Sequence, residues 1–104
     1  MSTAVASARL EWEEGNRRFE EAVRDPATRD RLYAQVEVVS EELRKRLGSI
    51  FTLEELAHAY LSAEHWARQA VAERAPTPGW PRTVALAEDA AFHAYARGAI
   101  DYKP

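Results

Sequence analysis

Apolar residues recur every three or four positions along most of this chain, with charged residues between them. On an α-helix this spacing places the apolar side chains on one face, where they can pack against a neighbouring helix. No segment shows the strict alternation of apolar and polar residues that is typical of a half-buried strand. The pattern predicts an all-α fold with helices over residues 4–24, 26–47, 52–75 and 82–97.

The apolar faces of these helices define the expected core. Along the first three helices they comprise Val5, Ala8, Trp12, Gly15, Phe19 and Val23, then Leu32, Val36, Val39, Leu43 and Leu47, then Leu53, Leu56, Tyr60, Ala63, Ala67 and Val71. Gly15 costs about 1 kcal/mol relative to alanine within a helix, so we expect a neighbouring helix to approach closely there. Short connections favour antiparallel neighbours. We therefore expect an antiparallel bundle of three or four helices, forming one domain over residues 1–104.

The residues between the apolar faces are ones that begin and end helices. Asp25 is a preferred N-cap, and Pro26 is tolerated at the first helical position. Thr52 and Glu55 have the spacing of a capping box, which predicts that the third helix begins there. Residues 76–81 contain three prolines and a glycine, and they predict a rigid, non-helical joint before the fourth helix.

Charge and composition narrow the function classes. The formal net charge is −3, from 14 basic and 17 acidic side chains, and no basic block is present to neutralise phosphates. Nucleic acid is therefore an unlikely partner by charge alone. The absence of cysteine excludes disulfides and thiolate chemistry. No apolar run has the length of a membrane span. We expect a cytoplasmic bacterial protein that has no membrane partner.

Two carboxylate–histidine pairs are the main candidates for catalysis or metal binding. Glu55 and His58 are three residues apart, which matches half of a di-metal carboxylate site, and Asp89 and His93 are four residues apart. A complete site of that kind needs Glu-x-x-His on two helices and a glutamate on each of two others. We therefore predict no catalytic residue, metal or cofactor. A metal-dependent or acid–base enzyme that uses these two pairs is the alternative.

The remaining signal is a surplus of apolar side chains. Trp80 lies in the predicted joint, Trp66 lies beside the main face of the third helix, and Trp12 lies on the first. Further apolar residues lie off the main faces of their helices, namely Leu10, Tyr33, Val38 and Leu61. Tryptophan is a frequent anchor of protein interfaces. The sequence thus favours a non-catalytic interaction or adaptor module that binds another protein through Trp80, Trp66 and Trp12 and forms a homo-oligomer.

A nucleic-acid-associated regulator is the third function class. Residues 51–57, Phe-Thr-Leu-Glu-Glu-Leu-Ala, resemble the opening of the first helix in many bacterial helix-turn-helix regulators. In such proteins a short turn and a second, groove-reading helix follow. Here the helical pattern continues unbroken to Val71. The resemblance is therefore confined to the start of this helix, and the chain is assigned to no family on its sequence.

Overall fold

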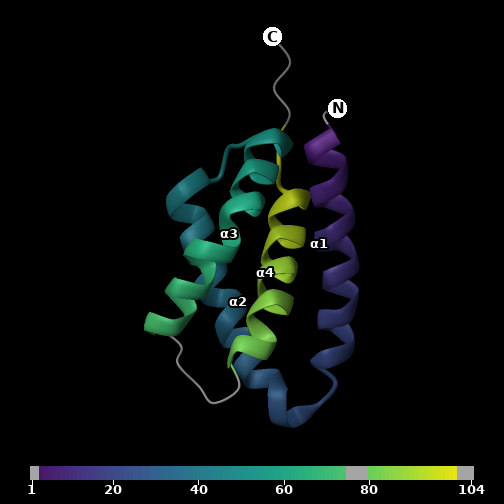
Figure 1. Cartoon of the computed structure of the whole chain (residues 1–104), viewed down its shortest axis with the longest axis vertical. Helices are drawn as coiled ribbons and strands as arrows, with labels where there is room; N and C mark the ends of the chain where they lie inside the picture. Colours follow the sequence, from purple (N-terminus) through teal and green to yellow (C-terminus); the bar gives the residue numbers. More distant parts are fainter. Residues whose placement is uncertain (1–2, 75–79, 101–104) are drawn as a thin grey trace.

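Four helices form the chain in the computed structural model, which describes residues 3–74 and 80–100. They are α1 (Thr3–Ala22), α2 (Pro26–Leu47), α3 (Leu53–Arg74) and α4 (Trp80–Arg97). Helices α1 and α3 run in one direction and α2 and α4 in the other, so that α1 begins and α4 ends at the same end of the bundle (Figure 1). The prediction of an all-α antiparallel bundle is confirmed.

Helix α4 is the central element of the bundle. It packs against each of the other three helices, whereas α1 and α2 make few contacts with each other. The reason lies in its sequence, because a helix that is apolar on most sides can be covered by several neighbours. The buried positions of α4 include Val84, Ala87, Ala91 and Phe92. The small alanine side chains allow neighbouring helices to come close.

The predicted apolar faces pack in the core, and further residues are buried with them. Val38, which was expected off the main face of its helix, is buried, because α2 packs against both α3 and α4 and so buries a wider face. Gln35 is fully buried, and its side-chain oxygen accepts a hydrogen bond from the Thr83 hydroxyl of α4. A polar residue is usually predicted to face solvent, so the sequence pattern did not indicate this contact.

The helix ends follow the capping residues. Thr52 and Glu55 form the predicted capping box: the Thr52 N–H donates to the Glu55 carboxylate at 3.1 Å, and the Glu55 N–H donates to the Thr52 hydroxyl at 3.1 Å. Asp25 is the N-cap of α2, and Pro26 follows it in the first turn. Helix α1 ends at Ala22, two residues earlier than predicted, and a turn leads from there to Asp25.

The start of α4 corrects the sequence prediction. Trp80 and Pro81 belong to the helix, although both were assigned to the proline-rich joint. Proline is accepted in a first turn because the N–H that it lacks would have no partner there. The rest of the predicted joint, residues 76–79, lies outside the described residues. Within the described part of the chain, no helix combines the length and apolar character needed to cross a lipid bilayer.

Candidate functional site

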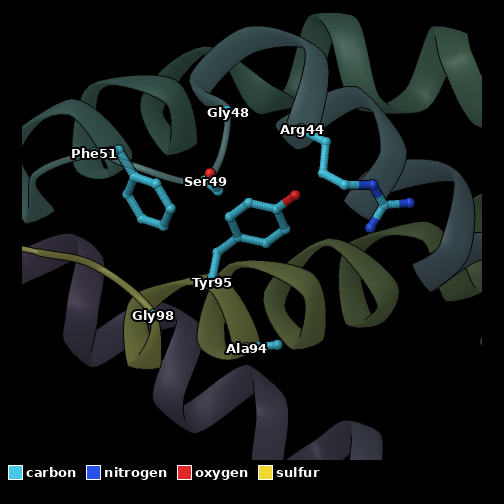
Figure 2. Close-up of a pocket in the computed structure, with 7 residues that line it drawn as sticks. All are labelled: Arg44, Gly48, Ser49, Phe51, Ala94, Tyr95 and Gly98. Carbon is cyan, nitrogen blue, oxygen red and sulfur yellow. The ribbon is translucent and has the colours of Figure 1, made fainter.

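A cavity opens at the end of the bundle where α2 ends, α3 begins and α4 ends. Its volume is about 430 Å³, and we call it the end pocket; its lining residues are Arg44, Gly48, Ser49, Phe51, Ala94, Tyr95 and Gly98. Figure 2 shows the Tyr95 ring in the middle of the group, with Phe51 on one side and Arg44 on the other. Aromatic and small residues thus form most of its surface, with one cationic side chain at the wall.

Hydrogen bonds and ring packing hold the end pocket in shape. The Tyr95 hydroxyl donates to the Ser40 carbonyl at 3.1 Å, and the rings of Tyr95 and Phe51 lie 5.5 Å apart. The Ile100 N–H donates to the Phe51 carbonyl at 2.8 Å, which ties the segment after α4 to the start of α3. Gly48 has a φ of 72°, a conformation that favours glycine and turns the chain out of α2. The pocket is therefore preformed.

Two exposed isoleucines border the end pocket. Ile50 is 61% exposed and lies in the chain between the lining residues Ser49 and Phe51. Ile100 is 45% exposed and is held to Phe51 by its backbone hydrogen bond. We call the end pocket together with Ile50 and Ile100 the apolar end. Large aliphatic side chains that gather around a cavity mark a surface that another molecule can cover.

Among the described residues that line the end pocket, Arg44 alone carries a charge. Its neighbours in the last turn of α2, Lys45 and Arg46, both pair with Glu42, at 3.9 and 4.0 Å. Arg44 forms no ion pair with any residue that the structure describes. Burial raises the pKa of Tyr95, and the positive charge and hydrogen bond of Arg44 offset part of that rise. The guanidinium thus lies beside the Tyr95 hydroxyl, without a carboxylate partner in the described chain.

A second cavity lies between α1, α3 and α4. Its volume is about 230 Å³, and we call it the acidic cavity; it is lined by Glu11, Tyr60, Leu61, Glu64, Arg68 and Glu88. Next to Glu88 in the chain, Asp89 is buried and accepts a hydrogen bond from the Tyr60 hydroxyl at 2.7 Å. Three helices therefore contribute polar groups to one cavity, whose lining residues Glu11, Glu64 and Arg68 are exposed.

Gly15 explains how Asp89 can be buried there. A Cβ atom on Gly15 would overlap the Asp89 side chain, so the glycine provides the space that this carboxylate occupies. This is the close approach of a neighbouring helix that the sequence predicted for Gly15, and the neighbour is α4. Glycine destabilises a helix relative to alanine, but at this position it leaves the space that allows the buried Asp89 carboxylate to reach Tyr60.

The acidic cavity raises the pKa of Glu88 to about 7. Burial is the largest cause, and the negative charges of Asp89 and Glu64 add to it, whereas the positive charge of Arg68 lowers the pKa. Glu88 therefore exchanges its proton near neutral pH, a property shared by many general acids and bases.

Burial is also the main cause of the raised pKa values of Asp89 and Tyr60. The Tyr60 hydrogen bond and the charge of Arg18 lower the pKa of Asp89 in part, and the charge of Glu11 raises it. In the described residues no three metal-ligating side chains come together. The cluster supplies groups that can bind protons, but its geometry does not define a reaction.

The structure shows other contacts for members of the two predicted carboxylate–histidine pairs. The Glu55 carboxylate is engaged in the capping box, and His58 is exposed on α3. Asp89 accepts its hydrogen bond from Tyr60, on another helix, while His93 lines a different cavity with Arg9 and Glu13 among others. The structure thus directs Asp89 towards α1 and α3.

The three tryptophans differ in their surroundings. Trp12 has no exposed surface, and its ring packs against Tyr60 at 5.3 Å and Phe92 at 6.0 Å. The expectation that Trp12 contributes to a recognition surface is therefore wrong, because its ring fills the centre between α1, α3 and α4. Trp66 is half-buried, with the Arg46 guanidinium 4.5 Å from its ring centroid. The side chain of Trp80 lies outside the described part of the chain.

Of the other apolar residues that the sequence placed off the main faces, Leu10, Tyr33 and Leu61 are exposed.

No family model, curated protein or solved structure matches this chain. An interpretation of its function therefore rests on the geometry of the apolar end and of the acidic cavity.

Proposed function

We propose that this chain is a non-catalytic binding module that docks a segment of another protein at its apolar end. The observation that supports the proposal is a preformed cavity of about 430 Å³ bordered by exposed Ile50 and Ile100. Ligand sites typically have volumes of about 300–1,000 Å³, with apolar and aromatic walls and a few polar groups. The end pocket has this composition, with Phe51 and Tyr95 as aromatic walls and Arg44 as a polar group (Figure 2).

The position of the apolar end also supports a docking role. It is formed by the α2–α3 connection and by the residues at the end of α4, so a partner can cover it without separating the helices (Figure 1). Loops carried on a rigid scaffold are frequent binding sites. Fully burying one isoleucine contributes about 1.5–3 kcal/mol. Two isoleucines and one small pocket therefore favour a reversible contact of moderate affinity.

The test compares capture of partner proteins by the native chain and by a double variant with Ile50→Asp and Ile100→Asp. Both side chains are exposed, so we expect the variant to remain folded, with a change in stability of about 0.5 kcal/mol or less for each substitution. We expect the native chain to capture a partner protein from lysate of its host and the double variant not to capture it. We also expect the double variant not to bind the purified partner. Isothermal titration calorimetry measures this loss of binding.

The matched control is Leu10→Asp, because Leu10 is 59% exposed on α1 and does not line the end pocket. This variant should bind as the native chain does. Equal binding by the native chain and the double isoleucine variant would refute docking at the apolar end. Light scattering measures the oligomeric state of both proteins. If the native chain is a dimer and the double variant is a monomer, the partner that docks at the apolar end is a second copy of this chain.

A further inference from the structure

The lining of the end pocket indicates the chemistry of the group that enters it. Its walls combine the rings of Phe51 and Tyr95 with one guanidinium, that of Arg44, and no acidic side chain lines it among the residues that the structure describes. An aromatic or large aliphatic group fits the walls, and a negative charge fits the guanidinium. The ligand class is therefore apolar and anionic.

We infer that the end pocket binds the C-terminal residue of a partner protein, with an aromatic or large aliphatic side chain against Phe51 and Tyr95 and the free carboxylate on Arg44. The inference rests on the proposed docking function, and it adds the identity of the docked group.

Charge complementarity selects a carboxylate for the polar end of the ligand. Lys45 and Arg46 are already paired with Glu42, whereas Arg44 has no ion-pair partner among the described residues. The planar guanidinium matches a carboxylate with two parallel hydrogen bonds, which a point charge cannot do. The Ser49 hydroxyl lines the same pocket and is a further donor.

The size of the pocket indicates that the apolar side chain and the carboxylate of the ligand belong to one residue. A volume of about 430 Å³ is at the small end of the range for ligand sites. The aromatic walls and Arg44 surround the same cavity, as Figure 2 shows, so the apolar group and the carboxylate must be close to each other. A C-terminal residue carries both groups on one Cα atom, and capture of such carboxylates is an established mode of peptide recognition.

The experiment is an NMR titration of the full chain with N-acetyl-phenylalanine and with its uncharged amide. We expect the acid to bind about tenfold more tightly than the amide, the ratio expected from one charge-assisted hydrogen bond. The backbone amides of Gly48, Ser49, Phe51 and Gly98 should shift. Raising the salt concentration should weaken binding of the acid and leave that of the amide unchanged.

Two variants separate the role of Arg44 from a general effect of positive charge. Arg44→Gln should abolish the preference for the acid and keep the weak binding of the amide. Arg46→Gln, in the same turn of α2, removes an equal charge outside the pocket and should keep the preference. Equal affinity for acid and amide, or an unchanged preference in Arg44→Gln, would overturn the inference.

Other results distinguish this inference from the docking function. If neither probe binds, but a partner is still lost on mutation of Ile50 and Ile100, docking holds and recognition of a C-terminal residue is refuted. A second result is that the acid binds with the expected preference, but the double isoleucine variant still captures every partner. This result would refute docking of a protein at the apolar end, and it would therefore also refute recognition of a partner's C-terminal residue. A third result is that the same amide signals shift as the protein concentration rises, with no probe present. This result would show that a second copy fills the pocket, and it would overturn the inference.

Discussion

At the scale of single residues, the pairing of Gly15 with Asp89 has the largest consequence for packing. Glycine is the poorest helix former after proline, yet here it lies in the middle of α1, opposite a buried carboxylate. The space that it leaves is filled by Asp89, whose second contact is the Tyr60 hydroxyl. The missing methyl group on α1 thus permits a polar contact between α3 and α4.

Gly15→Ala is therefore expected to destabilise the protein by about 1–3 kcal/mol, the usual cost of overpacking, although helix propensity alone would predict a gain of about 1 kcal/mol. Urea unfolding followed by circular dichroism measures the change. The control is Gly98→Ala, where an added Cβ would lie 3.6 Å from the Tyr95 carbonyl oxygen, an ordinary contact. A Gly15→Ala protein as stable as the native one would show that α4 yields at this position.

At the scale of elements, local signals predicted some boundaries well and failed where tertiary contacts decide. The start of α3 was readable because the Thr52–Glu55 capping box forms within four residues. The wide buried face of α2 was not, because Val38 and Gln35 are buried only through its two neighbours, α3 and α4. Pro81 was interpreted as a helix breaker, although in a first turn it is compatible with a helix.

The capping box gives a prediction for α3. Thr52→Ala removes the hydroxyl that accepts from the Glu55 N–H, and it should cost about 1 kcal/mol of unfolding free energy. Thr52→Ser keeps the hydroxyl and should remain within about 0.5 kcal/mol of the native value. Thermal or urea unfolding of the two variants checks this difference. Equal stability of the alanine and serine variants would mean that the hydroxyl does not contribute.

At the scale of the whole molecule, both cavities arise from the arrangement of helices. Arg44 and Tyr95 meet because α2 and α4 end at the same end of the bundle, and no spacing rule within one helix could indicate this. Phe51, which directly precedes the predicted start of α3, lines the pocket. The predicted histidine pairs were chosen by spacing within a helix, whereas the contact that the structure shows for Asp89 joins two helices.

The acidic cavity makes stability depend on pH in a direction that is unusual for carboxylates. The pKa of Glu88 rises on folding from 4.5 to about 7, so the folded state binds the proton more tightly than the unfolded state. The contribution of Glu88 to the free energy of unfolding is therefore greatest below pH 4.5, and it is lost as the pH rises through 7. Allowing for solvent screening, we expect a loss of about 1–2 kcal/mol between pH 5 and pH 8.

Urea unfolding at the two pH values measures this loss. Glu88→Gln should remove most of it, and Glu37→Gln, on the exposed surface of α2, serves as the control that should retain it. Asp89, whose pKa is also raised, contributes in the same direction. A native protein that gains stability from pH 5 to pH 8 would contradict the assignment of a raised pKa to Glu88.

The central position of α4 has a consequence for the order in which the chain can fold. Helices α1 and α2 are made before α3 and α4 and are joined by a short turn, yet they make few contacts with each other. Phe19, near the end of α1, packs against Tyr33 of α2. The rings that cover Trp12, in contrast, lie on α3 and α4, which leave the ribosome later. The part of the α1 face around Trp12 therefore stays uncovered until α3 and α4 have been synthesised, and the nascent chain depends on late, non-local contacts to protect it from aggregation.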